Sequence, residues 1–188
     1  RLIWKLFRSR IEQGLSLLSP PYNQILEIGY GSGLVLPSLC ALGHKVTAVD
    51  ICSEPEKIIK PLSQMDCHCE LIKCNFSEAE FEQESFDLVV AFSILEHVED
   101  ILPVVNQVHS ILKPGGHFLV GMPRVDYLMD KAFKLIGYDN INDHHVTNYR
   151  QCMAACSNLM TLQKMTWIPS MVPEFSALYY NMLFSKAC

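Results

Sequence analysis

Short apolar runs alternate with amphipathic segments along the first two thirds of the chain. Strand-like apolar runs of the kind that build a sheet are found at residues 25–28, 45–49, 70–73, 88–92 and 117–121. Apolar residues recur at helical spacing over 34–42 and 101–112, with Pro37 in the first turn of the former, where proline is tolerated. This β-α-β-α rhythm predicts an α/β fold, in which a parallel sheet has helices on both faces.

Several local signals refine these boundaries. Gly43 is suited to end the helix at 34–42. Ser53 and Glu56 form a capping-box pattern that predicts a short helix, broken or kinked near Pro61. Residues 113–116 read K-P-G-G, a strong signal for a stop and a turn.

The last third of the chain is less regular. Helices are expected over 125–136 and 149–159, and residues 125–160 are expected to form helices or a lid on the acceptor side. Asn158 is a residue able to adopt the left-handed conformation that ends a helix. Two closing strands are expected at 162–168 and 177–185. Together with the five earlier runs, they bring the expected sheet to seven strands.

Length and composition favour one globular domain over residues 1–188. The chain has 188 residues, of which 49% are apolar, enough for one sizeable core. No apolar run reaches the roughly 18–20 residues of a membrane span, and residues 1–18 do not resemble a signal peptide. We therefore expect a soluble, cytoplasmic protein.

The charge of the chain indicates which kinds of partner it can bind. The net charge of −5 argues against binding of nucleic acid, which requires clustered basic side chains. The one basic cluster, Arg1, Lys5, Arg8 and Arg10, alternates with apolar residues in an expected N-terminal helix within residues 1–20. Packing of this helix on the domain is the favoured interpretation, and contact with a membrane surface is the alternative.

The eight cysteines are expected to be mostly free thiols, because a chain with this much apolar material does not need a disulfide framework. The sequence Cys67-His68-Cys69, followed by Cys74, is the one cluster to weigh as a metal site. Its spacing is not that of a zinc site, and it lies in an expected strand, where alternate side chains point to opposite faces. No metal is therefore predicted.

The glycine-rich segment after the first strand is the most informative. It reads E-I-G-Y-G-S-G, with glycine at positions 29, 31 and 33. A dinucleotide fingerprint would place its third glycine at position 34, which is Leu34. Asp50 ends the second strand, where a carboxylate can accept two hydrogen bonds from a ribose diol and disfavours a 2′-phosphate. Loop and acid together predict a nucleoside-containing cofactor.

These motifs resemble those of the class I S-adenosylmethionine-dependent methyltransferases. The resemblance rests on the E-x-G-x-G-x-G loop, the V-D pair, the run S-F-D-L-V-V-A-F-S-I-L-E-H-V-E-D and the later L-K-P-G-G. It covers residues 25–123, and 143–159 more loosely, and is nearest to enzymes that act on small metabolites, including quinone precursors. It implies a Rossmann-like, mostly parallel seven-stranded sheet with an antiparallel last strand. It also implies S-adenosylmethionine as cofactor and S-adenosylhomocysteine as product.

The resemblance also implies roles for individual residues. Gly29, Gly31 and Gly33 would line the methionine part of the cofactor, and Glu27 would lie beneath its amino group. The other implied contacts are at the ends of the second, third and fourth strands: Asp50 and Ile51 at ribose and adenine, Asn75 and Phe76 at adenine, and Phe92 and Ser93 at the methionine part. Asn75 stands where many members have an acid. Tyr30 is bulkier than the family's usual small residue, so a different loop shape is expected.

A sulfonium methyl group is already activated for direct in-line displacement. Alignment of the reactants and exclusion of water are therefore the main tasks of the protein, and orientation alone can lower the barrier by roughly 7–11 kcal/mol. His145 and His97 are the candidate general bases for a hydroxyl or ammonium acceptor, and both also suit a role in orienting loops. The pair His144-His145 makes a poor metal site. Two interpretations are open for four large side chains, lining of an apolar acceptor pocket or packing in the core: Met122, Tyr127, Tyr149 and Trp167.

Transfer of a methyl group to a small-molecule acceptor is thus the expected function. A catalytically silent domain of the same fold is the main alternative, and an NAD-dependent oxidoreductase is a lesser one. Residues 91–94 read A-F-S-I and lack the motif of amino-methylating DNA enzymes. The chain is also too short for a protein arginine methyltransferase. Acceptor, methylated atom and oligomeric state stay open.

Overall fold

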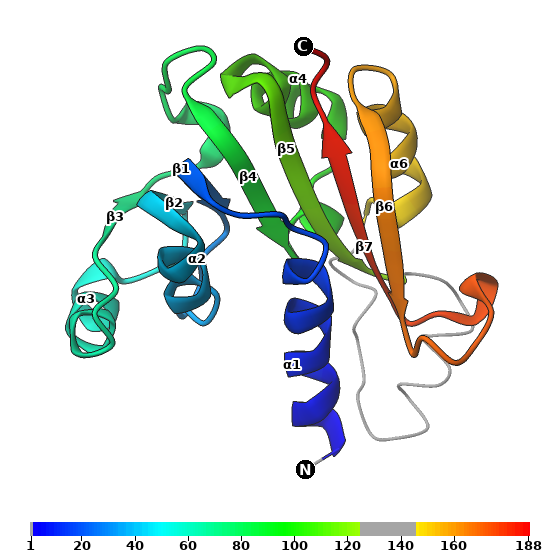
Figure 1. Ribbon diagram of the computed structural model, residues 1–188, viewed down its shortest axis with the longest axis horizontal. Helices are drawn as coiled ribbons and strands as arrows, with labels where there is room; N and C mark the ends of the chain where they lie inside the picture. The colour runs from blue at the N-terminus through cyan, green and yellow to red at the C-terminus, as the bar shows by residue number, and fades with distance from the viewer. Residues whose placement is uncertain (1, 125–145) are drawn as a thin grey trace.

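The computed structural model describes residues 2–124 and 146–188, which form a seven-stranded sheet flanked by helices (Figure 1). The strands are β1 (Tyr22–Ile28), β2 (Gly43–Asp50), β3 (Cys69–Lys73), β4 (Phe86–Phe92), β5 (Leu112–Pro123), β6 (Thr161–Ile168) and β7 (Tyr179–Ser185). The helices are α1 (Leu2–Leu15), α2 (Leu36–Leu42), α3 (Pro55–Gln64), α4 (Ile101–Ile111) and α6 (Tyr149–Ser157). Short 3-10 turns are η1 (Phe76–Glu78), η2 (Leu95–His97) and η4 (Glu174–Ser176).

The strand order is β3-β2-β1-β4-β5-β7-β6. The pairs from β3 to β5 are all parallel, whereas β7 runs antiparallel to both β5 and β6. The predicted mostly parallel sheet with an antiparallel last strand is confirmed. The order reverses between β1 and β4, and the carboxyl ends of strands at such a point are where α/β sheets bind ligands.

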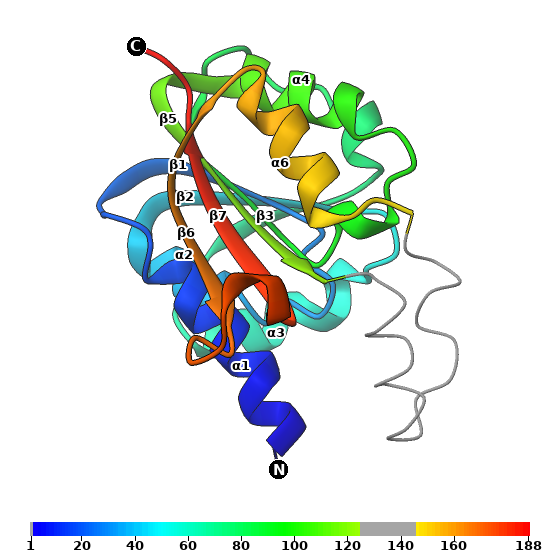
Figure 2. The same ribbon diagram turned by 90° about the vertical axis from the view of Figure 1, so that its right-hand side faces the viewer.

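Alternate residues of β1 face two separate cores. Leu26 and Ile28 belong to the cluster that α4 and α6 cover, while Ile25 belongs to the cluster under α1, α2 and α3. Figure 2 shows these two groups of helices on opposite sides of the sheet. Burial on both faces explains why the central strands read as continuous apolar runs, and it confirms the three-layer architecture.

The turn predicted at residues 113–116 is wrong as an element boundary. β5 begins at Leu112, which pairs with Phe86, and the pairing resumes only at Leu88 with His117. The K-P-G-G segment is therefore an irregularity inside one long strand, with Gly115 at a φ of +74°. The predicted break in the regular backbone does occur at Gly115. The strand nevertheless begins before it, because Leu112 already pairs with Phe86.

Gly43 caps α2 as predicted, with an extended φ of −141°, and also starts β2; a Cβ there would lie 2.5 Å from Ile25 Cδ1, so packing explains the glycine. Two other predicted helix ends differ. Ser53 does not cap α3, because its backbone N–H is bonded to Asp50, and Glu54 takes the cap position without a side-chain bond. Asn158 has a right-handed φ of −72°.

The predicted helix at 125–136 lies outside the described residues. α6 is shorter than expected and begins with a capping box: the Asn148 side chain accepts from Gln151 N, and the Gln151 side chain accepts from Asn148 N. The buried side of α6 packs in the core that it shares with α4. The expectation of acceptor-side helices or a lid over 125–160 stays a prediction, and α6 is one of the helices that cover the sheet.

Six cysteines are free, as predicted, but Cys40 and Cys67 form a disulfide that was not predicted. They are 27 residues apart in sequence, and only the packing of α2 against the start of β3 brings them together.

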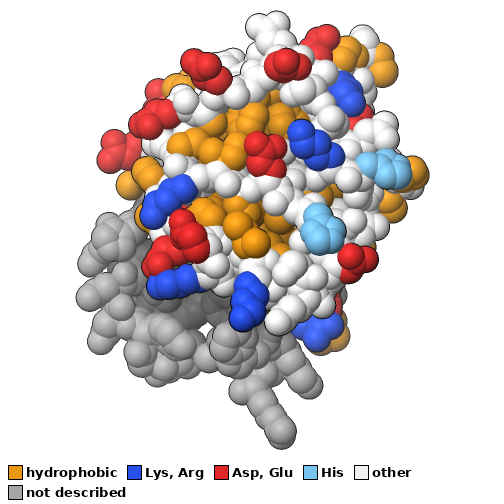
Figure 3. Space-filling model, turned by 90° about the vertical axis from the view of Figure 1, so that its left-hand side faces the viewer, with side chains coloured by type: hydrophobic (Ala, Val, Ile, Leu, Met, Phe, Trp, Pro, Cys, Tyr) orange, Lys and Arg blue, Asp and Glu red, His pale blue; other side chains and the backbone are white. Residues whose placement is uncertain are grey.

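The surface at the β3 edge carries apolar, acidic and basic side chains interspersed, without a continuous basic patch among the described residues (Figure 3). Within the described ranges, no helix is long and apolar enough to cross a membrane.

Candidate cofactor and acceptor site

The glycine loop leaves the carboxyl end of β1 and depends on its glycines. Gly29 and Gly33 have φ angles of +78° and +76°, which side-chain-bearing residues rarely adopt. A Cβ at Gly29 would lie 2.9 Å from Ile94 Cγ1, and one at Gly33 would lie 2.7 Å from Ile58 Cγ2. The loop therefore lies tightly between η2 and α3, and its backbone is open to a ligand only on its remaining side.

Asp50 ties this loop to the end of β2. Its Oδ2 accepts a hydrogen bond of 2.8 Å from Gly31 N, and its Oδ1 accepts from Cys52 N and Ser53 N at 2.7 and 2.9 Å. A carboxylate has about four acceptor positions, so capacity for a hydroxyl donor is left. Asp50 thus positions both loops around the place where a ribose would bind.

Glu27 lies in β1 directly before the loop and is 2% exposed. Burial, and then the negative charge of Asp50, raise the pKa of its carboxyl group to about 8. Its Oε2 has no hydrogen-bond partner within the described part of the chain. A buried acceptor without a partner is costly, and a bound ammonium group would satisfy it and favour its ionised form.

The adenine-side residues fall into two groups. Ile51 is 59% exposed and Asn75 is exposed beside it at the same edge of the sheet, as a ligand contact requires. Asn75 Oδ1 caps η1 by accepting from Ser77 N. The Phe76 ring, in contrast, is buried in the α4-side core, and its carbonyl accepts from Gln107 Nε2 at 3.0 Å. Phe76 thus contributes packing, and its ring is not available to adenine.

At the end of β4, Phe92 packs beneath α1: a Cβ at Gly14 would lie 2.6 Å from Phe92 Cε1. Ser93 adopts a φ of +53°. Its Oγ accepts a hydrogen bond from Arg10 Nη1 and shares another with the Tyr179 hydroxyl, both at 2.9 Å. Ser93 therefore links α1 to the start of β7 at this edge of the sheet.

This linkage includes polar residues that the sequence analysis missed. Burial raises the pKa of the Tyr179 hydroxyl, and the Arg10 guanidinium lies 5.5 Å from the Tyr179 ring centroid. Asn181 Nδ2 donates to the Arg10 carbonyl. The sequence predicts Arg10 only as part of a basic helix face. No local sequence pattern predicts these contacts, because Asn181 is 171 residues away from Arg10 in the sequence.

Glu96 is a second buried carboxyl group at this edge, 2% exposed. Burial raises its pKa to about 7, although a backbone hydrogen bond and the nearby His97 and Arg10 act in the opposite direction. Its Oε2 also has no hydrogen-bond partner among the described residues. In the L-E-H-V segment the sequence predicts His97 as the functional residue, whereas Glu96 beside it is the buried titratable group.

The two histidines predicted as bases are only partly described. His97 is exposed at the end of η2. His144 and His145 lie outside the described residues. Val146 N donates to the Glu96 carbonyl at 2.9 Å, so the chain re-enters the described structure beside η2.

The residues weighed as an acceptor pocket belong mainly to the core. Met122 and Tyr149 are buried in the α4-side cluster, and Tyr149 stacks on Tyr180 with a centroid distance of 3.7 Å. Trp167 packs against the same cluster, and Tyr127 lies outside the described residues. A groove of about 260 Å³ between α2 and α3 includes Gly33 but none of the other predicted site residues.

Comparison with known proteins places the chain in a family. Residues 4–153 match the family described as methyltransferase domain. The chain belongs to this family. The class inferred from the glycine loop is thereby confirmed, and with it the resemblance to methyltransferases.

A similar curated relative is the ubiquinone biosynthesis O-methyltransferase of Xanthomonas axonopodis pv. citri (strain 306), 33% identical over 112 residues. The match covers 57% of this chain and 46% of that protein, so the chain spans about half the length of the curated relatives it matches.

Solved structures share the fold. N-methyltransferase NodS from Bradyrhizobium japonicum WM9, in complex with S-adenosylhomocysteine, has a TM-score of 0.71 and 21% identity, covering 95% of this chain and 86% of that one. The cyclase SpnF has a TM-score of 0.74 at 10% identity, with coverage of 94% and 79%. A fold that also occurs in a cyclase shows that activity must be argued from the site.

Proposed function

We propose that the methyltransferase domain transfers a methyl group from S-adenosylmethionine to a small-molecule acceptor. One observation carries this proposal: in a member of the methyltransferase domain family, the glycine loop, held by Asp50, comes directly after β1, whose buried Glu27 has an Oε2 without a partner among the described residues. A carboxyl group in that position suits an ammonium group, which S-adenosylmethionine carries and a bare adenine nucleotide lacks.

Each part of the cofactor has a matching residue in the proposed site. Glu27 accepts from the amino group of the methionine part, and the positive-φ loop gives that part close access to the backbone. Asp50 accepts from the ribose hydroxyls with its remaining capacity. Ile51 lies against adenine, and Asn75 supplies a polar contact to it.

The bound cofactor supplies an activated methyl group, and the protein aligns the acceptor for in-line displacement. Ser93, held by Arg10 and Tyr179, marks the edge where the acceptor meets the methionine part. Proton removal from a hydroxyl or ammonium acceptor falls to His145 or His97, as the sequence predicts. Glu96 joins them as a candidate, because a pKa of about 7 suits a general base near neutral pH.

The acceptor class is proposed from the relatives. The similar curated proteins are named O-methyltransferases of ubiquinone biosynthesis, so hydroxylated aromatic compounds are the first acceptors to test. An apolar ring bearing a phenolic hydroxyl also suits an edge that combines Tyr179 with buried polar groups. Within the cell, we propose a cytoplasmic location.

A methyl-transfer screen tests the proposal. The purified chain is incubated with S-adenosylmethionine labelled in the methyl group and with a panel of phenols, catechols and amines. Label is expected in at least one acceptor, and much less with Asp50→Ala. Cofactor binding without transfer to any acceptor would favour the catalytically silent alternative, and fluorescence enhancement of NADH would favour an oxidoreductase.

A further inference from the structure

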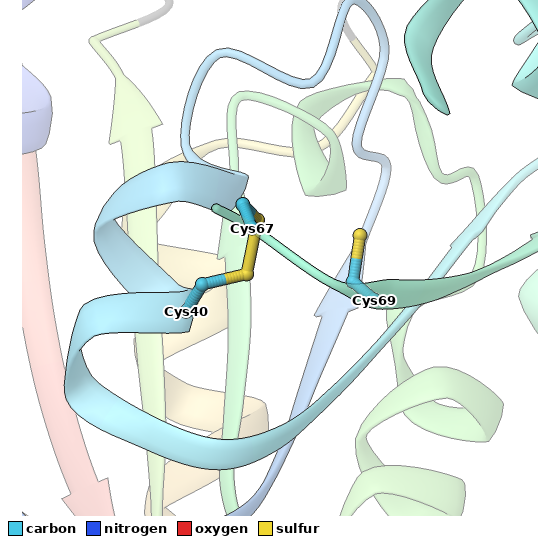
Figure 4. A group of neighbouring side chains, drawn as sticks. All are labelled: Cys40, Cys67 and Cys69. Atoms are coloured by element: carbon cyan, nitrogen blue, oxygen red, sulfur yellow. A yellow bond between two sulfur atoms is a disulfide. The ribbon is translucent and has the colours of Figure 1, made fainter. Parts of the chain in front are cut away.

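Three cysteine sulfur atoms converge where α2 meets the start of β3. Cys40 is on α2, Cys67 lies just before β3, and Cys69 is the first residue of β3 (Figure 4). Their Sγ atoms all lie within 4.8 Å of one another. Cys40 and Cys67 form a disulfide, and Cys69 is a free thiol.

The fold explains this convergence. Residues two apart in an extended segment point to the same side, so Cys67 and Cys69 share a face of the sheet. β3 pairs with β2 so that Cys69 lies opposite Val46, whose side chain is in the core beneath α2. Cys40 and Cys69 pack against that same core, and Cys67 is within it. The three sulfur atoms therefore come from three separate backbone segments that the sheet holds in place.

We propose that Cys40, Cys67 and Cys69, once the disulfide is reduced, form a three-thiolate site that binds zinc(II), with water as the fourth ligand. Zinc takes sulfur ligands at about 2.3 Å, which places the sulfur atoms of a tetrahedral site about 3.8 Å apart. All three sulfur atoms already lie within 4.8 Å of one another, and reduction lets the bonded sulfur atoms of Cys40 and Cys67 move apart toward that spacing. Cys40 and Cys69 are half-buried, which leaves a path for water to the fourth position.

Charge favours zinc(II) over copper(I), the other thiophilic ion that cysteine sites select. Three thiolates with zinc(II) carry a net charge of −1, and with copper(I) a net charge of −2. The surroundings are apolar, and burial disfavours excess negative charge there. The less negative complex is better suited to this place.

Oxidation and metal binding exclude each other here. A dithiol reductant transfers two electrons and two protons to the Cys40–Cys67 bond, the bond breaks, two thiols form, and the reductant becomes a disulfide. Zinc(II) then displaces one proton from each of the three thiols. In the oxidised chain only Cys69 can offer a thiolate, so the structure with the disulfide is the metal-free form.

Nearby residues provide the controls. His68 lies between two of the ligands in sequence, but its side chain is 78% exposed and lies 3.5 Å from Asp66, away from the cluster. Cys74 follows the same strand, is half-buried and free, and packs against the opposite core. Cys74→Ser therefore removes a comparable thiol without touching the proposed site.

The test is a competition titration of the full chain with zinc(II) and a chromophoric chelator, after reduction by a phosphine that contains no thiol. Wild type and Cys74→Ser are expected to bind one zinc ion per chain. Cys69→Ser and Cys40→Ser are expected to bind at least roughly 100-fold more weakly, since loss of outer-shell partners alone costs 10–100-fold. Protein with the disulfide intact is expected to bind as weakly as these variants.

Thermal unfolding gives a second readout. Because zinc(II) binds the native site, it should raise the Tm of reduced wild type and of Cys74→Ser, but not of Cys69→Ser. Circular dichroism checks that each variant is folded, and Cys69→Ser is the mildest because it leaves the other pair intact. Failure of reduced wild type to bind one zinc ion would overturn the proposal. Equal affinities of Cys69→Ser and Cys74→Ser, or of oxidised and reduced protein, would overturn it too.

Discussion

Replacing Glu27 by glutamine should make the cofactor-free protein more stable. The folded chain holds the pKa of this carboxyl group at about 8, against a usual value of 4.5. The native state therefore keeps a proton that the unfolded chain loses between these two values. The free energy of unfolding falls as pH rises through that window. Glutamine does not titrate and has nearly the shape of the protonated acid.

The gain can be worked out from the shift. A pH of 7 lies about 2.5 units above the usual pKa of glutamate in the unfolded chain, and each unit corresponds to about 1.4 kcal/mol of unfolding free energy. Glu27→Gln should therefore raise the free energy of unfolding by about 3 kcal/mol at pH 7, or the Tm by roughly 6–12 °C. At pH 5 the gain should fall to about 0.8 kcal/mol, because pH 5 is only about 0.5 unit above the pKa of the unfolded glutamate, so roughly a quarter of it is then protonated.

Urea unfolding of both proteins at pH 5 and pH 7 measures this difference, with Glu80→Gln as a control at an exposed position. Cofactor affinity should change in the opposite direction, because the amide cannot offer a charge to the ammonium group. A variant less stable than wild type at pH 7, or a stability gain that is equal at both pH values, would refute the assignment of a buried protonated Glu27.

Three further predictions address the site. Cofactor binding at pH 7 should release about 0.9 proton, since Glu27 is mostly protonated before binding and ionised afterwards; calorimetry in buffers of different ionisation enthalpy measures this, and an equal release by Glu27→Gln would contradict it. Asn75→Asp keeps the oxygen that caps η1 and should bind the cofactor as well as or better than wild type, so a tenfold loss in a direct titration would assign Asn75 another role. Replacing the true general base, His145 before His97, by glutamine should lower turnover by roughly 10²–10⁴-fold at nearly constant cofactor affinity; full turnover by both variants on the identified acceptor would leave alignment as the mechanism.

The architecture was predictable because it depends on periodicity. The run at 88–92 and the spacing over 101–112 each required burial that only a layered sheet provides, and β4 and α4 formed where expected. Boundaries failed where a long-range partner decided the outcome. Asp50 bonds the backbone of Ser53 and so displaces the cap of α3 by one residue.

Only the part of the site that lies next to strand ends was predictable from the sequence. The glycine loop and Asp50 are adjacent to strand ends, so the sequence alone places them at one edge of the sheet. The contacts of Arg10 with Ser93 and of Cys40 with Cys67 depend on how distant segments pack, and no local spacing encodes them. The unusual protonation of Glu27 and Glu96 arises from burial, which is known only once both faces of the sheet are covered.

Calorimetric titration with S-adenosylhomocysteine tests the central claim most directly. The account predicts one site per chain with a dissociation constant in the micromolar range. Asp50→Ala should bind roughly 10–150-fold more weakly, because a hydrogen bond to a charged group contributes about 1.5–3 kcal/mol, while the control Asp66→Ala, at a side chain that is 98% exposed, binds like wild type. The absence of both heat and thermal shift in folded wild-type protein would contradict the claim that this domain binds the cofactor.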